Sequence, residues 1–134
     1  LGKMTPHPRE YGGIVIVLRK WVRGVTRPDM PEEPGAKIVT LEEAVRKMTS
    51  LPAQRLGLKG RGLLREGMWA DVVVFDPDRV TDKALYPGPA NRKPHMYPEG
   101  IPYVIVNGTI VINHGEHTGS LPGKVLRGPG YEAS

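Results

Sequence analysis

Hydrophobic residues in this chain gather in a few short clusters, which are separated by segments rich in Pro and Gly. The first cluster, residues 14–22, contains branched aliphatic residues that favour a strand. Ile14, Leu18 and Val22 also fit one face of a helix, so the pattern alone leaves both structures open. The flanking residues 1–12 and 24–36 are rich in Pro and Gly, which is typical of loops.

Two consecutive helices follow this cluster. Thr40 and Glu43 have the spacing of a capping box, in which a hydroxyl and a carboxylate satisfy exposed amide groups at a helix start. The apolar residues after Thr40 recur at helical spacing and predict a helix over 41–49. Ser50 is a suitable cap for a second, shorter helix over roughly 52–56.

Beyond residue 60 the pattern becomes that of strands. Residues 62–67 predict a short strand and turn. The apolar run within 71–76 is bracketed by acids and predicts a strand that is covered on both faces. Residues 77–100 contain five prolines and few aliphatic residues, so we expect a long loop there.

The clearest hairpin joins two strands over 103–106 and 109–112. Asn107 and Gly108 between them are suited to the positive φ values of a type I′ turn. The tail, residues 113–134, is polar and rich in Gly, and we predict no strand there. Four or five strands in all do not close a sheet, and open edges require partners. The open edges are the first indication that the chain is part of a larger protein or assembly.

Composition narrows the classes of function. The chain has 134 residues, enough for one domain, and a net charge of +5. Its basic residues are scattered and only one Phe is present, so the basic and aromatic interleaving of a nucleic-acid binder is missing. The absence of Cys excludes disulfides and thiolate zinc sites and fits a cytoplasmic protein. No apolar run approaches the roughly 20 residues that cross a bilayer, so we expect no membrane partner.

Several stretches resemble one enzyme superfamily. Residues 41–58 resemble the last barrel helix of amidohydrolases, and residues 62–76 resemble their entry into a small β-sandwich. Two stretches resemble a narrower family, the N-acyl-D-amino-acid deacylases. These are residues 7–12, with the sequence HPREYG, and the closing strands and tail over 97–127. Together the stretches cover about residues 5–128 in the order of that family.

The resemblance implies a fold class. The chain would be an α+β fragment, in which residues 1–59 supply the terminal loop and last helices of a (β/α)8 metal-dependent hydrolase barrel. Residues 60–134 would supply the carboxy-terminal half of a small composite β-sandwich and a tail. In the family this small domain is built from both ends of the polypeptide. The resemblance also implies that residues 14–22 are helical.

The resemblance implies zinc-dependent hydrolysis of the amide of an N-acyl-D-amino acid to a carboxylate and a free D-amino acid. In such enzymes zinc lowers the pKa of a bound water, and an aspartate after the last barrel strand is the general base. The family's ligands include a His-x-His pair and a cysteine, which this sequence lacks. We therefore expect zinc and the catalytic aspartate on an N-terminal portion or companion chain, and we expect the isolated chain to be inactive.

Two other functions remain open at this point. One is a different amidohydrolase that acts on a cyclic amide, like a dihydroorotase or a hydantoinase. The other is a non-catalytic, β-rich interaction domain, which would fold alone without metal or partner. Neither requires a D-amino-acid substrate.

Arg9 and His7 are the candidate substrate-binding residues, because they follow the strand end that carries catalysis in such barrels. An N-acyl amino acid keeps a free carboxylate, which an arginine can hold with two parallel hydrogen bonds. The alternatives are an Arg9 that pairs with Glu10 or another neighbour, and a structural His7 packed on Pro8.

The remaining candidate residues are assigned mainly structural roles. His114 and His117 lie three residues apart, but in a Gly-broken loop without a third ligand, so we assign no metal ligand to this chain. His117 belongs to a family-like stretch and is a further candidate at the mouth of the active site. His95 is expected to be a solvated loop residue, and Asp71 and Asp76 are expected to end the strand between them.

Overall fold

The structure, a computed structural model, describes residues 7–85, 95–128 and 130–131. It divides into two units: unit 1 comprises Leu1–Ala44 and Asp76–Gly100, and unit 2 comprises Val45–Phe75 and Ile101–Ser134. Each unit is described by itself below. The predicted boundary between residues 59 and 60 concerns the barrel and the sandwich of a complete enzyme, and it stays a prediction.

Unit 1 begins with two short helical segments, α1 at Arg9–Gly12 and the π-helix η1 at Val17–Val22. The prediction that residues 14–22 are helical is confirmed, in spite of their branched side chains. The backbone N–H of Arg23 donates to the C=O of Leu18 over 3.1 Å, which is the i→i+5 bond of a π-turn. This wider turn buries two consecutive side chains, Leu18 and Arg19.

The rest of unit 1 is mostly irregular backbone, and hydrogen bonds between distant segments hold it. Thr81 and Glu99 exchange two backbone bonds of 3.1 and 3.0 Å, and the N–H of Ala36 donates to the C=O of Lys20 over 2.9 Å. Val80 is fully buried, and a small apolar core includes Leu18. The loops predicted over 24–36 and 77–100 are confirmed for the residues described.

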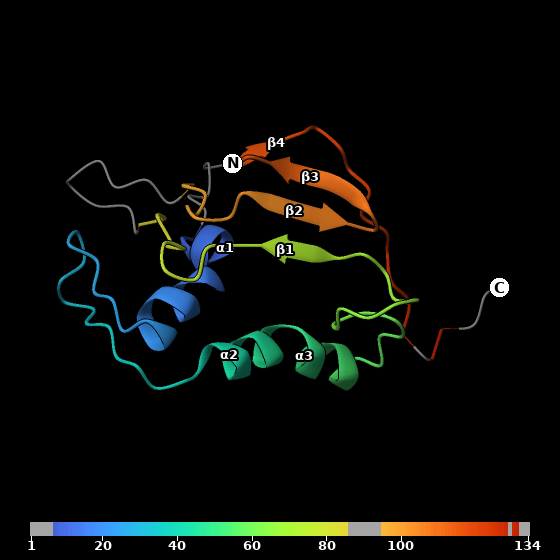
Figure 1. Cartoon of the computed structure of the whole chain (residues 1–134), viewed down its shortest axis with the longest axis horizontal. Helices are drawn as coiled ribbons and strands as arrows, with labels where there is room; N and C mark the ends of the chain where they lie inside the picture. The colour runs from blue at the N-terminus through green and yellow to red at the C-terminus, as the bar shows by residue number, and fades with distance from the viewer. Residues whose placement is uncertain (1–6, 86–94, 129, 132–134) are drawn as a thin grey trace, which may run out of the picture. The chain divides into compact units, whose positions relative to one another are not determined.

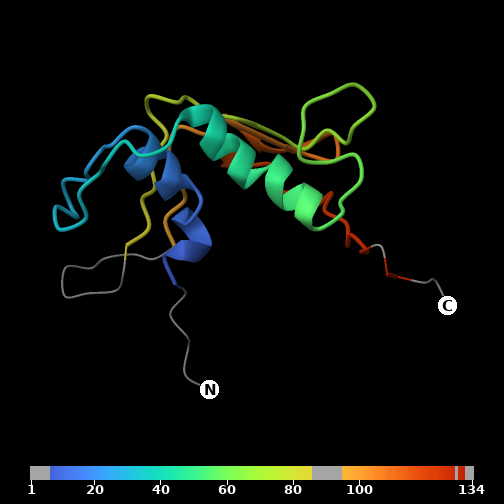
Figure 2. The ribbon, with the colours of Figure 1, turned by 90° about the horizontal axis from the view of Figure 1, so that it is seen from below.

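The two predicted helices are present. The first, α2, spans Leu41–Met48, and the N–H of Glu43 donates to Oγ1 of Thr40 over 3.2 Å, as the capping pattern requires. The second, α3, spans Ser50–Arg55 and follows closely behind α2 (Figure 2). The predicted cap at Ser50 is wrong, because Ser50 lies inside the helix and is buried. Thr49 precedes it, and its hydroxyl donates back to the C=O of Val45 over 2.7 Å.

Unit 2 contains a four-stranded antiparallel sheet, in which neighbours in sequence are neighbours in space (Figure 1). The strands are β1 Val72–Val74, β2 Tyr103–Val106, β3 Thr109–Asn113 and β4 Glu116–His117. The predicted turn between β2 and β3 is confirmed, since Asn107 and Gly108 have φ values of 49° and 81°. A bulge interrupts the β2–β3 register between Val104 and Ile105.

Three strand predictions are wrong. Residues 62–67 form turns and bends, because Gly62 and Gly67 have φ values of 83° and 78°, which break an extended strand. The tail contains the unexpected strand β4, since His114 and Gly115 form a second tight turn with φ values of 50° and 85°.

The third error concerns β1, which was expected to be covered on both faces. Its residues Val73 and Val74 are 54% and 44% exposed. Among the described residues β1 lies at the edge of the sheet beside β2, and no described segment fully covers Val73 or Val74. No helix among the described residues is long and apolar enough to cross a membrane.

Two glycines of unit 2 with the same backbone conformation allow a matched stability test. A Cβ on Gly62 would lie 2.6 Å from Cβ of Ala53, whereas a Cβ on Gly67 would meet nothing within 4 Å. We expect Gly67→Ala to lower the free energy of unfolding by about 1–2 kcal/mol, because alanine is strained in a left-handed backbone conformation. Gly62→Ala should cost about 1–3 kcal/mol more through overpacking. Urea unfolding of both variants checks this, and equal losses would contradict the described packing.

Candidate substrate-binding site

His7 and Arg9 lie on one tight turn at the start of α1. The backbone N–H of Arg9 donates to Nδ1 of His7 over 3.1 Å, and the N–H of His7 donates to Oε1 of Glu10 over 3.3 Å. These reciprocal bonds are arranged like a capping box, with an imidazole in place of the usual hydroxyl. Because Nδ1 of His7 accepts a hydrogen bond, the neutral ring carries its proton on Nε2. The structure thus brings the two predicted residues together.

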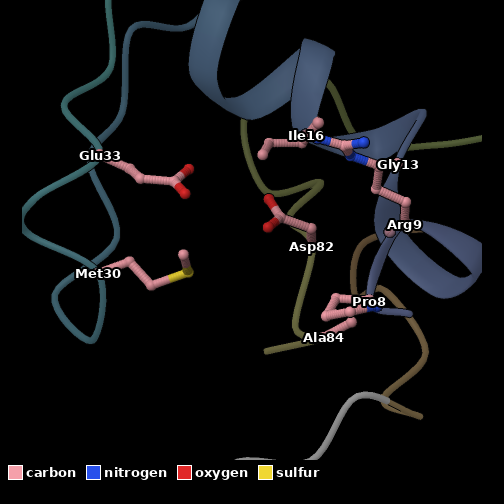
Figure 3. Close-up of a pocket in the computed structure, with 9 residues that line it drawn as sticks. Pro8, Arg9, Gly13, Ile16, Met30, Glu33, Asp82 and Ala84 are labelled. Carbon is pink, nitrogen blue, oxygen red and sulfur yellow. The ribbon is translucent and has the colours of Figure 1, made fainter. Parts of the chain in front are cut away.

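Arg9 is exposed, and among residues 7–85, 95–128 and 130–131 no carboxylate forms an ion pair with its guanidinium. The alternative partner Glu10 instead accepts the backbone N–H of His7. Arg9 lines a hollow within unit 1 together with Asp82 and Glu33 (Figure 3). In the same view the side chains of Met30 and Glu33 point from their loop toward the segment that carries Asp82.

A buried carboxylate lies beside this hollow, held between two arginines. Asp82 is only 4% exposed, and Arg19 and Arg27 are 1% and 6% exposed. Nε of Arg19 lies 2.5 Å from Oδ1 of Asp82, and Nη1 of Arg27 lies 3.1 Å from Oδ2. Charges buried to this extent are tolerated only when they are paired and hydrogen-bonded, and here both conditions are met.

Arg27 extends the network beyond Asp82. It donates two hydrogen bonds to Asp29, of 2.9 and 2.6 Å, and two weaker ones to the carbonyls of Lys83 and Ala84, of 3.3–3.4 Å. Arg23, one turn after Arg19, donates to the carbonyls of Asp78 and Val80. Arginines thus hold the segment 78–84 through both its side chains and its backbone.

The charges of this cluster stabilise one another's ionised forms. Burial by itself raises the pKa of Asp82, but hydrogen bonds and charge from Arg19 and then Arg27 outweigh it and hold the pKa below its usual value. Burial likewise acts to lower the pKa of Arg27, but Asp29 and Asp82 outweigh it and raise that pKa. The hydrogen bonds from Arg27 are also the largest cause of the lowered pKa of Asp29.

The other candidate histidines have local partners. His117 lies in β4, in unit 2, and its Nδ1 accepts the N–H of Gly119 over 2.9 Å. The ring of His114 lies within hydrogen-bond distance of the Tyr103 hydroxyl, and His95 packs edge-on against Tyr11 in unit 1. Each of these histidines therefore has a partner within its own unit.

The donor set for a metal is also missing from the part of the chain that the structure describes. No group of three or more His, Cys, Asp or Glu side chains there could hold a metal ion. Asp71 accepts the N–H of Asn107 over 2.8 Å and pairs with Arg61, so it fastens the hairpin turn. The residues present therefore do not fit a zinc site.

The buried cluster was missed by the sequence analysis. Its one local signal is the spacing of Arg19, Arg23 and Arg27, which lie four residues apart. Their acidic partner Asp82 lies 55–63 residues further along the chain, so only the fold reveals the pairing. Asp82 itself lies in a segment that was expected to be an ordinary loop.

Comparison with known proteins places the chain in a family. A model described as the amidohydrolase family matches residues 17–112, which is most of the chain. This chain belongs to the amidohydrolase family. The chain is a part of the amidohydrolase fold that contains helices and an open sheet. That the helices belong to a barrel and the strands to a composite sandwich stays a prediction.

Three relatives of this amidohydrolase chain come from Alcaligenes xylosoxydans xylosoxydans. They are an N-acyl-D-glutamate deacylase, 42% identical over 91% of the chain, an N-acyl-D-aspartate deacylase, 43% identical over 90%, and a D-aminoacylase, 40% identical over 90%. The predicted resemblance to N-acyl-D-amino-acid deacylases is confirmed. The chain spans only 21–22% of the length of these relatives.

Solved structures agree with the sequence relatives. A crystal structure of a D-aminoacylase shares 37% identity with a TM-score of 0.66, over 86% of this chain and 21% of that one. An N-acyl-D-glutamate deacylase from Bordetella bronchiseptica shares 43% identity with a TM-score of 0.62, over 79% of this chain and 19% of that one. The latter was solved with zinc and a phosphonate inhibitor that mimics the tetrahedral intermediate of the reaction.

The Asp82 ion pairs make stability depend on pH. A carboxylate with a lowered folded-state pKa stabilises the fold above its unfolded pKa of about 3.9, and this stabilisation is lost as pH falls through the lowered value. At pH 7 we expect Asp82→Asn to cost about 3–5 kcal/mol in the free energy of unfolding. The exposed Asp78→Asn should cost little.

Urea unfolding at pH 7 and at about pH 3 measures this dependence. The difference between the natural protein and Asp82→Asn should narrow at the lower pH, because the carboxylate of the unfolded chain binds its proton there while the lowered pKa keeps the folded one ionised. A difference that stays constant between the two pH values would contradict an ionised Asp82 in the folded protein.

Proposed function

We propose that this chain is the carboxy-terminal section of a zinc-dependent N-acyl-D-amino-acid deacylase. In the proposed reaction the oxygen of water bonds to the acyl carbon, the C–N bond breaks, and the released amine takes up a proton. The products are a carboxylate and a free D-amino acid. The observation that carries this proposal is the shared naming of three relatives at 40–43% identity, all of them deacylases of this type.

The comparisons favour this reaction over the alternatives. The solved relatives are a D-aminoacylase and an N-acyl-D-glutamate deacylase, rather than hydrolases of cyclic amides. A non-catalytic β-rich interaction domain is also not favoured, because the matched relatives are enzymes and the family match extends from residue 17 to residue 112, across helices as well as strands.

The proposal divides the work between this chain and the rest of the enzyme. Zinc, held by residues outside this chain, would supply Lewis-acid activation of the attacking water. We assign its ligands and the catalytic aspartate to an N-terminal portion or companion chain, because the described residues do not fit a metal site. A zinc-bound relative supports the choice of metal.

Arg9 is the residue through which this chain would contact the substrate. An N-acyl-D-amino acid carries a free carboxylate, and a guanidinium can bind it with two parallel charge-assisted hydrogen bonds. Arg9 is exposed, its backbone is held by His7, and no described carboxylate competes for its side chain. His7 holds the turn through Nδ1 and is a further proposed contact with substrate. His117 remains a further proposed contact.

Purification of the protein together with its natural partners tests the proposed function. Every co-eluting polypeptide is weighed by mass spectrometry, bound zinc is measured, and hydrolysis is assayed with N-acetyl forms of D- and L-amino acids. We expect a zinc-containing species, one continuous chain or two, that hydrolyses the D forms. A folded, zinc-free monomer without partner or activity would refute the proposal.

Replacement of Arg9 tests its role directly. In the zinc-loaded complete enzyme we expect Arg9→Gln to lower kcat/KM by about 10- to 150-fold, because a hydrogen bond to a charged group contributes about 1.5–3 kcal/mol. Arg79→Gln is the matched control, since Arg79 is also an exposed arginine of unit 1. Steady-state kinetics with an acid substrate and its uncharged primary amide check the reason. For the amide, Arg9→Gln should lower kcat/KM only slightly. Equal decreases in kcat/KM for both substrates would contradict carboxylate binding.

A further inference from the structure

The turn that carries Arg9 packs closely against Asp82 and Ala84. Gly12, the last residue of α1, is buried. A Cβ on Gly12 would lie 3.1 Å from Cβ of Asp82 and 3.8 Å from Cβ of Ala84. The Cβ atoms of Asp82 and Ala84 thus lie directly against α1, and a shift of the segment 82–84 would displace α1. A contact this close is sensitive to a single methyl group.

The segment 82–84 has no regular secondary structure of its own to fix it. Its position depends on Asp82, whose two oxygens are bound by Arg19 and Arg27 at 2.5 and 3.1 Å. Arg27 also donates to the carbonyls of Lys83 and Ala84. If the carboxylate were lost, Arg19 would lose its ion-pair partner, and Arg27 would hold the segment only through these weaker bonds of 3.3–3.4 Å. The segment would also keep the exposed ion pair of Lys83 with Glu99.

The same carboxylate also fixes the chain that follows α1. Arg19 belongs to η1, which begins only five residues after Gly12. Asp82 thus holds α1 from two sides: through η1, which limits where the end of α1 can go, and through the segment on which Gly12 rests. Arg9 lies one helical turn from this contact and lines the same hollow as Asp82 (Figure 3).

We propose that Asp82 is a positioning residue for Arg9, which sets the place of the carboxylate-binding guanidinium through the Gly12 contact. The inference rests on the proposed role of Arg9 in substrate binding. Asp82 does not contact substrate, because it is buried and both of its oxygens are bound by arginines. A buried ion pair that served stability alone would have no influence on the substrate carboxylate.

Two variants disturb this arrangement by different routes. Asp82→Asn removes the charge that holds the segment. Gly12→Ala leaves all the ion pairs in place and inserts a methyl group between α1 and the segment; its backbone has no positive φ, so alanine is compatible there. Gly128→Ala is the control, because a Cβ at Gly128 would meet nothing within 4 Å.

Kinetics of the zinc-loaded complete enzyme separate positioning from stability. For an N-acetyl-D-amino acid we expect Gly12→Ala and Asp82→Asn to raise KM by about fivefold or more while kcat per folded enzyme changes by less than about twofold, because ground-state and transition-state binding are lost together. In the Arg9→Gln background the same changes should alter KM by less than about twofold, since residues that act through one contact are not additive. An unchanged KM, or fully additive effects, would overturn the inference.

A measurement without catalysis keeps the two proposals distinguishable. The N–H groups of Gly12 and Gly13 donate to the carbonyls of Pro8 and Arg9 over 3.0 Å, so their hydrogen–deuterium exchange reports on α1. Both variants should exchange faster over residues 9–13 than Gly128→Ala does. Unchanged exchange would overturn the positioning role. An enzyme without activity on N-acyl-D-amino acids, yet with faster exchange in the variants, would refute the proposed function and leave Asp82 as the residue that holds α1.

Discussion

A carboxylate buried between two guanidinium groups is the interaction on which unit 1 depends. An ionised Asp82 without partners would be strongly unfavourable at 4% exposure, and so would Arg19 or Arg27. The three groups are therefore stable only together, with the chain around residues 19, 27 and 82 held at one place. Such a cluster contributes less to net stability than an apolar core of the same volume, but it allows few alternative arrangements.

This constraint explains how a segment with little secondary structure can be ordered. Residues 76–85 contain no helix and only one isolated bridge pair, Thr81 with Glu99. Arginine side chains replace the missing helix or sheet partners, since they bind the Asp82 carboxylate and the carbonyls along residues 78–84. The fully buried Val80 lies within the segment they hold. The short α1, which carries Arg9, packs against this segment through Gly12.

The elements that the sequence predicted correctly are those with local causes. Thr40 caps α2 three residues from Glu43, and Asn107 and Gly108 form the hairpin turn on their own. The predictions failed at Ser50, which lies inside α3, and at β1, which is exposed, because the sequence does not show what covers each residue. Residues 62–67 are not a strand, because Gly62 and Gly67 adopt positive φ values. Arg9 and His7 were proposed as site residues only through the family resemblance. Asp82 was missed because no local pattern indicates partners 55 or more residues away.

We propose above that a firmly held Arg9 binds the carboxylate of an N-acyl-D-amino acid. A crystal structure of the complete enzyme with zinc and a phosphonate analogue that keeps the amino-acid carboxylate tests this role directly. We expect both guanidinium nitrogens of Arg9 at about 2.7–2.9 Å from that carboxylate, with Asp82 still between Arg19 and Arg27. A carboxylate held by other residues, with Arg9 turned away from it, would contradict the proposed role.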